Sequence, residues 1–148
     1  MDFKSMKDLE KYLNEQIAKS LENDVGSGVA RAKLKENIQS EVYDKYDPVM
    51  YQRDGETGEG TGGLIGDANI LVGMVDKNTV SIESHRMDNG RNVGVVVETG
   101  VGYNPEWKFP YTNKGRPFTE VTRDKLRNDG SVEHAIANGL KRQGLDVQ

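Results

Sequence analysis

The chain has 148 residues and a mass of 16.5 kDa, enough for one domain with a modest core. Twenty Lys and Arg against 24 Asp and Glu give a net charge of -4, which argues against a dedicated nucleic-acid-binding domain because such domains are basic. Without cysteine, disulfides, thiolate nucleophiles and Cys-ligated metals are excluded. The sequence has no membrane-length apolar run and no signal-peptide pattern, so we expect a soluble, cytosolic, non-enzymatic protein.

The first 47 residues have the pattern of helix. Ser5, three residues before Asp8, is a capping signal for its start. Gly26 and Gly28 interrupt the pattern and either break one long helix or bend it. The helix must end before Pro48, because proline disfavours helical backbone in the residue that precedes it. The apolar stripe at helical spacing consists of Met6, Leu9, Leu13, Ile17, Leu21, Leu34, Ile38 and Val42.

Residues 55–66 contain six glycines, so we expect a mobile loop that only a neighbouring chain would order. Within it, residues 58–63 satisfy the G-x-G-x-x-G pattern of dinucleotide-binding loops. That interpretation needs a strand before the glycines and a helix after them, and the flanking sequence predicts neither. A flexible loop is therefore favoured over a nucleotide site.

Strand signals follow the glycine loop. The apolar run 70–75, the turn residues 76–78 and the alternating run 79–83 predict a β-hairpin. Asp88-Asn89-Gly90 predicts a second tight turn. The short apolar run 93–97 fits a strand or a helix, and its periodicity does not decide between them.

The C-terminal third predicts an extended loop followed by helices. Residues 103–111 contain two prolines, which excludes a central strand. Pro117 is suited to the first turn of a helix that ends near residues 128–130. Ser131 is expected to cap the last helix, and Gly144 to end it. The expected fold is α+β, with a long N-terminal helix, a small, mainly antiparallel sheet and C-terminal helices in a single domain of residues 1–148.

No motif in the sequence predicts catalysis, a cofactor or a metal. His85 and His134 are 49 positions apart, and neither has the spacing of a metalloenzyme motif. The acidic residues do not form a calcium-loop pattern. We therefore expect no catalytic residue, no cofactor and no metal site.

Two aromatic segments are candidates for protein contact. Tyr43 and Tyr51 flank Pro48, with Arg53 close behind, and Trp107 and Phe109 lie in the extended loop. Each aromatic residue either packs within the domain or anchors an interface, where Tyr, Trp and Arg are enriched. Two such segments in so hydrophilic a chain favour a protein that works by contact.

Several segments, in this order, resemble the minor structural proteins at the head–tail junction of tailed bacteriophages: the head–tail joining, neck and tail-completion proteins. These segments are Val42-Tyr43-Asp44-Lys45-Tyr46-Asp47-Pro48 with Tyr51-Gln52-Arg53, Gly62-Gly63-Leu64-Ile65 with Asn69-Ile70, Val97-Glu98-Thr99-Gly100, Arg116-Pro117-Phe118-Thr119-Glu120, and Gly139-Leu140-Lys141-Arg142-Gln143-Gly144. The glycine loop between Arg53 and Gly63 is longer than this resemblance implies.

The resemblance implies a virion protein, assembled in the bacterial cytoplasm, that links the head connector to the tail. Its partners would be copies of itself in a ring, a hexamer in preference to a dodecamer, together with a head-closure protein and a tail terminator or tail tube protein. It implies no membrane contact and no sequence-specific nucleic acid, although genomic DNA would pass through the ring. The alternatives are a small nucleotide-binding enzyme that uses the glycine loop and a DNA-binding regulator.

The best-matched elements single out Glu98, Gly100, Arg116 and Phe118, in addition to Gly63. We expect Phe118, at a helix start, to pack inward against the N-terminal helix. Glu98 lies close to Gly100, where the chain turns. Its carboxylate could accept hydrogen bonds from Arg116 or from backbone amides at a helix start, and a bidentate arginine pair would be the stronger form.

Overall fold

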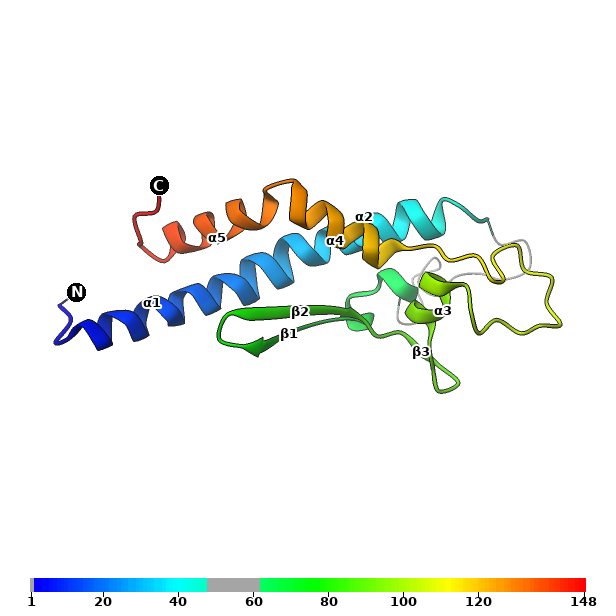
Figure 1. The fold of residues 1–148 in the computed structure, drawn as a ribbon, viewed down its shortest axis with the longest axis horizontal. Helices are drawn as coiled ribbons and strands as arrows, with labels where there is room; N and C mark the ends of the chain where they lie inside the picture. The colour runs from blue at the N-terminus through cyan, green and yellow to red at the C-terminus, as the bar shows by residue number, and fades with distance from the viewer. Residues whose placement is uncertain (1, 48–61) are drawn as a thin grey trace. The chain divides into compact units, whose positions relative to one another are not determined.

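A computed structural model describes residues 2–47 and 62–148 of the chain (Figure 1). The chain divides into two compact units. The first comprises Met1–Ala32, Val72–Ile82 and Leu126–Gln148, and the second comprises Lys33–Leu71 and Glu83–Lys125. The single domain expected from the chain length stays a prediction. Within the glycine loop, residues 55–61 lie outside the described residues.

Helix runs without interruption through four segments at the N-terminus. They are α1 (Met6–Ser20), the π-helical segments η1 (Leu21–Ala30) and η2 (Gln39–Tyr43), and α2 (Arg31–Ile38) between those two. Ser5 caps α1 as predicted, because its Oγ accepts a hydrogen bond from the Asp8 N–H at 3.2 Å. Both glycines that interrupt the apolar pattern fall inside η1, where wider π turns continue the helix through them.

In the first unit, α5 (Ser131–Arg142) packs along α1 and η1 (Figure 1). The contact is close at Gly139, where a Cβ atom would overlap the Ser20 hydroxyl and the Asp24 carboxylate. Ser20 donates a hydrogen bond to the Ile136 carbonyl at 3.2 Å. Polar residues of α1 are therefore buried at this contact, whereas Met6, at the start of the predicted apolar stripe, is 80% exposed.

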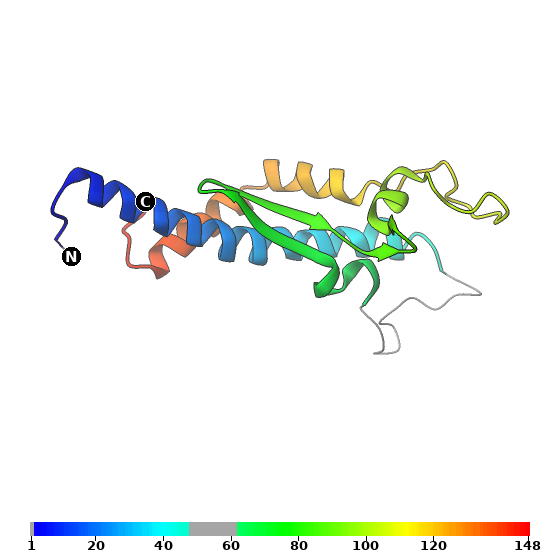
Figure 2. The ribbon, with the colours of Figure 1, turned by 90° about the horizontal axis from the view of Figure 1, so that it is seen from below.

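The predicted hairpin is present, formed by β1 (Ile70–Asp76) and β2 (Thr79–Ser84), which lie side by side in Figure 2. Its inner face packs on the helix at Gly26, where a Cβ atom would lie 2.6 Å from a Val72 methyl and 2.7 Å from a Val80 methyl. This close approach explains why glycine occupies that position.

A second, shorter hairpin in the second unit pairs β3 (Met87–Asp88) with β4 (Arg91–Asn92). The predicted turn connects the two strands, with Asn89 and Gly90 both at positive φ, as a tight hairpin turn requires.

The second unit holds two short 3₁₀ segments, η3 (Gly63–Ile65) and η4 (Asp67–Asn69), and the helices α3 (Val93–Thr99) and α4 (Phe118–Asn128). The apolar run at 93–97 is thus helical. Its local sequence explains why, because the Asn92 side chain accepts from the Val95 N–H at 3.3 Å and Gly100 ends the helix at φ 73°. The buried apolar residues of this unit are Leu34, Ile38, Val42, Leu64, Ile70, Val97 and Phe118.

The start of α5 corrects one prediction. Gly130 is the N-cap residue, in the left-handed conformation at φ 70°, and Ser131 is the first helical residue. The Asp129 carboxylate accepts from the Ser131 N–H at 3.0 Å, so the acidic residue two positions earlier satisfies this amide. Gly144, at φ 85°, follows the end of α5 as predicted. These elements confirm the α+β class, and no helix of the described residues is long and apolar enough to cross a bilayer.

Candidate interaction surface

The most distinctive surface feature of the second unit is the loop of residues 101–115 between α3 and α4, called here the aromatic loop. Its two ends are joined by backbone hydrogen bonds, from Asn113 to Gly100 at 2.8 Å and from Arg116 to Val97 at 3.0 Å. A Cβ atom at Gly100 would lie 2.5 Å from the Lys114 backbone. Glycine is therefore required here both for the positive φ and for the close crossing of the two chain segments.

Arg116 holds the base of this loop. It is 7% exposed, and its guanidinium donates to the Tyr103 hydroxyl at 2.9 Å and to the Val42 carbonyl at 3.4 Å. The guanidinium carbon also lies 4.3 Å from the centroid of the Tyr111 ring and 5.6 Å from that of Phe109. A planar guanidinium suits such a site, since it stacks on aromatic rings and donates along its edge.

Around Arg116 the aromatic side chains contact one another. Phe109 lies between Tyr103 and Tyr46, with ring centroids 4.7 and 5.1 Å away. The Tyr111 hydroxyl donates to the Lys45 carbonyl at 2.6 Å, which ties the loop to the segment after η2. Phe109 is half-buried in this cluster, so its contacts support the loop.

Trp107 differs from the other aromatic residues of the loop because it is 69% exposed. Its backbone is fixed, since its N–H donates to the Asn104 carbonyl at 3.0 Å and its carbonyl accepts from Phe109 at 2.8 Å. A tryptophan held outward by an ordered backbone loses little conformational entropy on binding, and tryptophan is the residue most enriched at interface hot spots. Among the candidates that the structure describes, Trp107 has the clearest features of a contact residue.

Glu98 adopts one of its two predicted arrangements. Its carboxylate accepts from the backbone N–H groups of Thr119 at 2.9 Å and Glu120 at 3.2 Å, in the first turn of α4. The pairing with Arg116 is not formed, because that guanidinium faces the aromatic cluster. Glu98 thus caps α4 from a different helix, and a carboxylate at this position also complements the helix dipole.

Phe118 is fully buried, at 0% exposure, as expected of a core residue. Beside it lies a polar network that the sequence did not predict. Buried Asn37 donates to the Thr122 hydroxyl at 2.9 Å and accepts from the Lys125 ammonium at 2.6 Å, while Thr122 donates to the Phe118 carbonyl at 2.7 Å. Thr122 and Lys125 are three apart on α4, a helical spacing that could have indicated a shared polar contact.

The remaining candidates are divided between two regions. Tyr43 and Gly63 contact the same short segment, because the Tyr43 hydroxyl accepts from the Ile65 N–H at 3.4 Å and the Gly63 carbonyl accepts from the Asn69 amide at 2.6 Å. Both therefore anchor η3 and η4 within the second unit. Pro48, Tyr51 and Arg53 lie outside the described residues.

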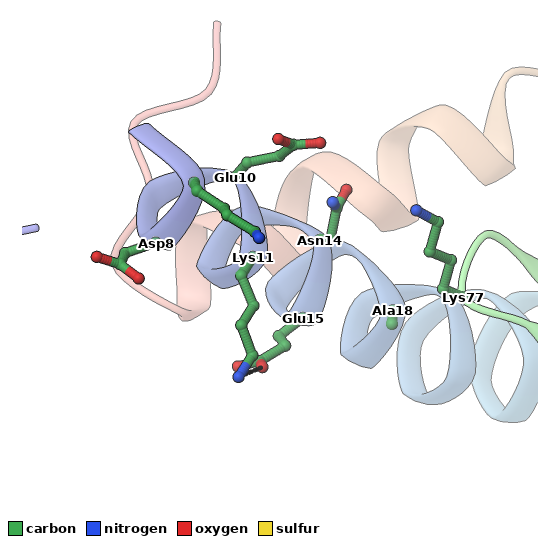
Figure 3. A pocket seen from close by; sticks show the side chains of 8 residues that line it. Asp8, Glu10, Lys11, Asn14, Glu15, Ala18 and Lys77 are labelled. Atoms are coloured by element: carbon green, nitrogen blue, oxygen red, sulfur yellow. Dashed lines mark ion pairs between the residues drawn. The ribbon is translucent and has the colours of Figure 1, made fainter. Parts of the chain in front are cut away.

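The first unit carries an open groove of about 500 Å³ along α1 and the turn between β1 and β2 (Figure 3). Its charged side chains have both signs, and Lys11 pairs with Glu15 at 4.0 Å. This mixture does not favour a ligand of either sign. The groove is lined by Lys7, Asp8, Glu10, Lys11, Asn14, Glu15, Ala18 and Lys77. In the described part of the chain, no group of three or more His, Asp or Glu side chains is placed to hold a metal.

The family of the chain follows from comparison with known proteins. The model of the YomN family matches residues 5–142, a range that contains every described helix and strand. The chain belongs to the YomN family. It is 31% identical over 147 residues to the SPbeta prophage-derived uncharacterized protein YomN of Bacillus subtilis (strain 168), and the match covers 96% of each chain. No solved structure matches this YomN-family chain.

Proposed function

We propose that this YomN-family chain is a non-catalytic virion protein that forms an oligomeric ring at the phage head–tail junction and links the head connector to the tail. The observation that carries the proposal is Trp107, exposed on a loop that Arg116 and the aromatic cluster hold in place. The prophage origin of the Bacillus subtilis relative supports the phage context. The ordered resemblance to neck and tail-completion proteins supports the position in the particle.

A ring needs heterologous interfaces, in which one surface of a subunit meets a different surface of the next. The charge distribution suits such a contact. Residues 55–100 carry three Lys or Arg and seven Asp or Glu, whereas residues 101–148 carry eight and six. The aromatic loop belongs to the basic part of the chain, so an acidic surface of a neighbouring copy would complement it. The expected ring is a hexamer, and its outer partners are a head-closure protein and a tail terminator or tail tube protein.

The test replaces Trp107 with alanine in the phage or prophage that encodes the chain. Because truncation of an interface hot spot costs about 2 kcal/mol or more, we expect at least about a tenfold loss of joined particles, with DNA-filled heads and separate tails seen by electron microscopy. Lys108→Ala is the matched control, since it truncates the exposed neighbour on the same loop and should leave the yield unchanged. Immunoblotting checks that both variants accumulate to the same level.

Two results would contradict the proposal. One is a purified virion from which the protein is absent. The other is normal joining of heads and tails after deletion of the gene. Labelling of the wild-type protein with a gold-tagged antibody should place it at the neck of intact particles, and label elsewhere on the virion would overturn the assigned position.

A further inference from the structure

We infer that β1 is a self-association surface, through which two copies of the free protein pair antiparallel about Gly73. The inference goes beyond the proposed ring and does not depend on it. It starts from the size of the sheet, because β1 and β2 form a sheet of only two strands among the described residues. Two-stranded hairpins are marginally stable by themselves, and a strand edge is a template for pairing with another strand.

The two faces of β1 differ in their surroundings. Val72 faces the helix at Gly26, which fixes the alternation of the strand. Leu71, Gly73 and Val75 therefore share the outer face, where Leu71 is 46% and Val75 66% exposed. A Cβ atom at Gly73 would meet nothing within 4 Å, so packing in this chain does not require glycine there. Two exposed apolar side chains flank an open backbone position.

Protection against edge pairing is weak along this strand. Natural edge strands commonly carry charges or proline that oppose pairing. Residues 70–75 contain neither, and the first charge of β1 is Asp76 at its end. β2, by contrast, carries Glu83 within the strand. The unprotected edge is thus on the β1 side of the hairpin.

The identity of the partner follows from the self-complementarity of β1. In an antiparallel pair centred on Gly73, Leu71 of one copy lies opposite Val75 of the other, and this contact occurs twice. A shift by one residue would place the exposed Leu71 opposite an inward-facing residue of the partner, so the apolar pattern favours this register. The contact is isologous and forms dimers, so it would not by itself close a ring. The occupant is a second copy of this chain.

Because the protein has no cysteine, single-cysteine variants can test the register directly. The two copies of residue 73 lie opposite each other at the two-fold axis, whereas the two copies of residue 75 are four positions out of register. Purified Gly73→Cys protein should therefore form a disulfide-linked dimer under mild oxidation at least about ten times faster than Val75→Cys, because a disulfide needs Cα atoms about 4.4–6.8 Å apart. An equimolar mixture of Leu71→Cys and Val75→Cys should form the mixed dimer.

A second measurement does not use cysteine. Val75→Lys should shift the protein from dimer to monomer in sedimentation velocity, because it places charge in the apolar contact. Met6→Lys is the matched control, since it replaces an exposed apolar residue of α1, outside the sheet, and should leave the dimer intact. Circular dichroism checks that both variants fold.

The inference is overturned if Gly73→Cys crosslinks no faster than Val75→Cys, or if Val75→Lys and Met6→Lys sediment as the same species. The Gly73→Cys/Trp107→Ala double variant separates this result from the proposed function. It should crosslink as fast as Gly73→Cys alone, because the strand contact does not use the aromatic loop. A slower rate in the double variant would overturn the independence of the two surfaces.

Discussion

At the scale of single residues, Arg116 shows how one side chain can organise a loop. A buried cation usually pairs with a carboxylate, but among the described residues the contacts of this guanidinium are two oxygens and two aromatic rings. The loop that it holds presents Trp107 to solvent. The likeness between Arg116 and a salt-bridging arginine is therefore limited to the sequence.

Phe118→Ala is expected to unfold the second unit. The side chain is fully buried at the start of α4, and truncation of a buried phenylalanine costs about 3–5 kcal/mol, a large part of the stability of a small domain. Urea denaturation followed by circular dichroism measures the loss. The control is Trp107→Ala, whose exposed side chain contributes little to folding, and equal midpoints for the two variants would contradict the core position of Phe118.

Glu98→Ala should lower the free energy of unfolding by about 0.5–2 kcal/mol and leave a folded protein that assembles poorly, because the first turn of α4 loses its cap. Glu98→Gln retains one acceptor oxygen and should lose less. Thermal unfolding of the three proteins gives the order. A double-mutant cycle with Arg116→Ala should return no coupling, since the two side chains do not pair, and a coupling above about 1 kcal/mol would contradict this account.

At the scale of elements, the contact between α5 and the N-terminal helix depends on close backbone approach rather than on a broad apolar stripe. Ser20 and Gln16 are buried there, and the Gln143 side-chain amide donates to the Gln16 carbonyl at 3.1 Å. Asp24 pairs with Arg142 at the edge of the same contact. Glycine at position 139 allows these polar groups to reach their partners.

Gly139→Ala tests this contact, because the new methyl group would overlap Ser20 and Asp24. Alanine gains helix propensity of about 1 kcal/mol, but overpacking of a tight contact costs about 1–3 kcal/mol, so we expect a net loss of about 1 kcal/mol. Differential scanning calorimetry would record a lower melting temperature. Lys141→Ala, at an exposed position of the same helix, should change it little, and a raised melting temperature for Gly139→Ala would show that the contact is loose.

At the scale of the whole molecule, two surfaces with different symmetry can serve different associations. The β1 strand is self-complementary and pairs two identical edges, whereas Trp107 lies on a loop with no such internal symmetry and suits a heterologous contact. A free dimer and an assembled ring would then use separate parts of the chain. The two proposals are tested by different variants for this reason.

Much of the fold is encoded locally and could be predicted. Capping by Ser5, the turns before Thr79 and at Gly90, and the end of α5 at Gly144 all depend on residues within a few positions of one another. The helical state of residues 93–97 was not predicted from their periodicity, although Asn92 and Gly100 at the two ends carry the signal. Short-range rules therefore decided most element boundaries.

Composition and local pattern determined the α+β class, the order of the elements and the choice of Glu98, Trp107, Arg116 and Phe118 as residues to examine. Only the tertiary structure decided their partners, because Glu98 bonds to amides 21 and 22 residues away and Arg116 to a carbonyl 74 residues away. Such contacts depend on how helices and loops pack, and no spacing along the chain encodes them. The exposure of Trp107 beside a half-buried Phe109 was settled in the same way, by which ring the neighbouring side chains cover.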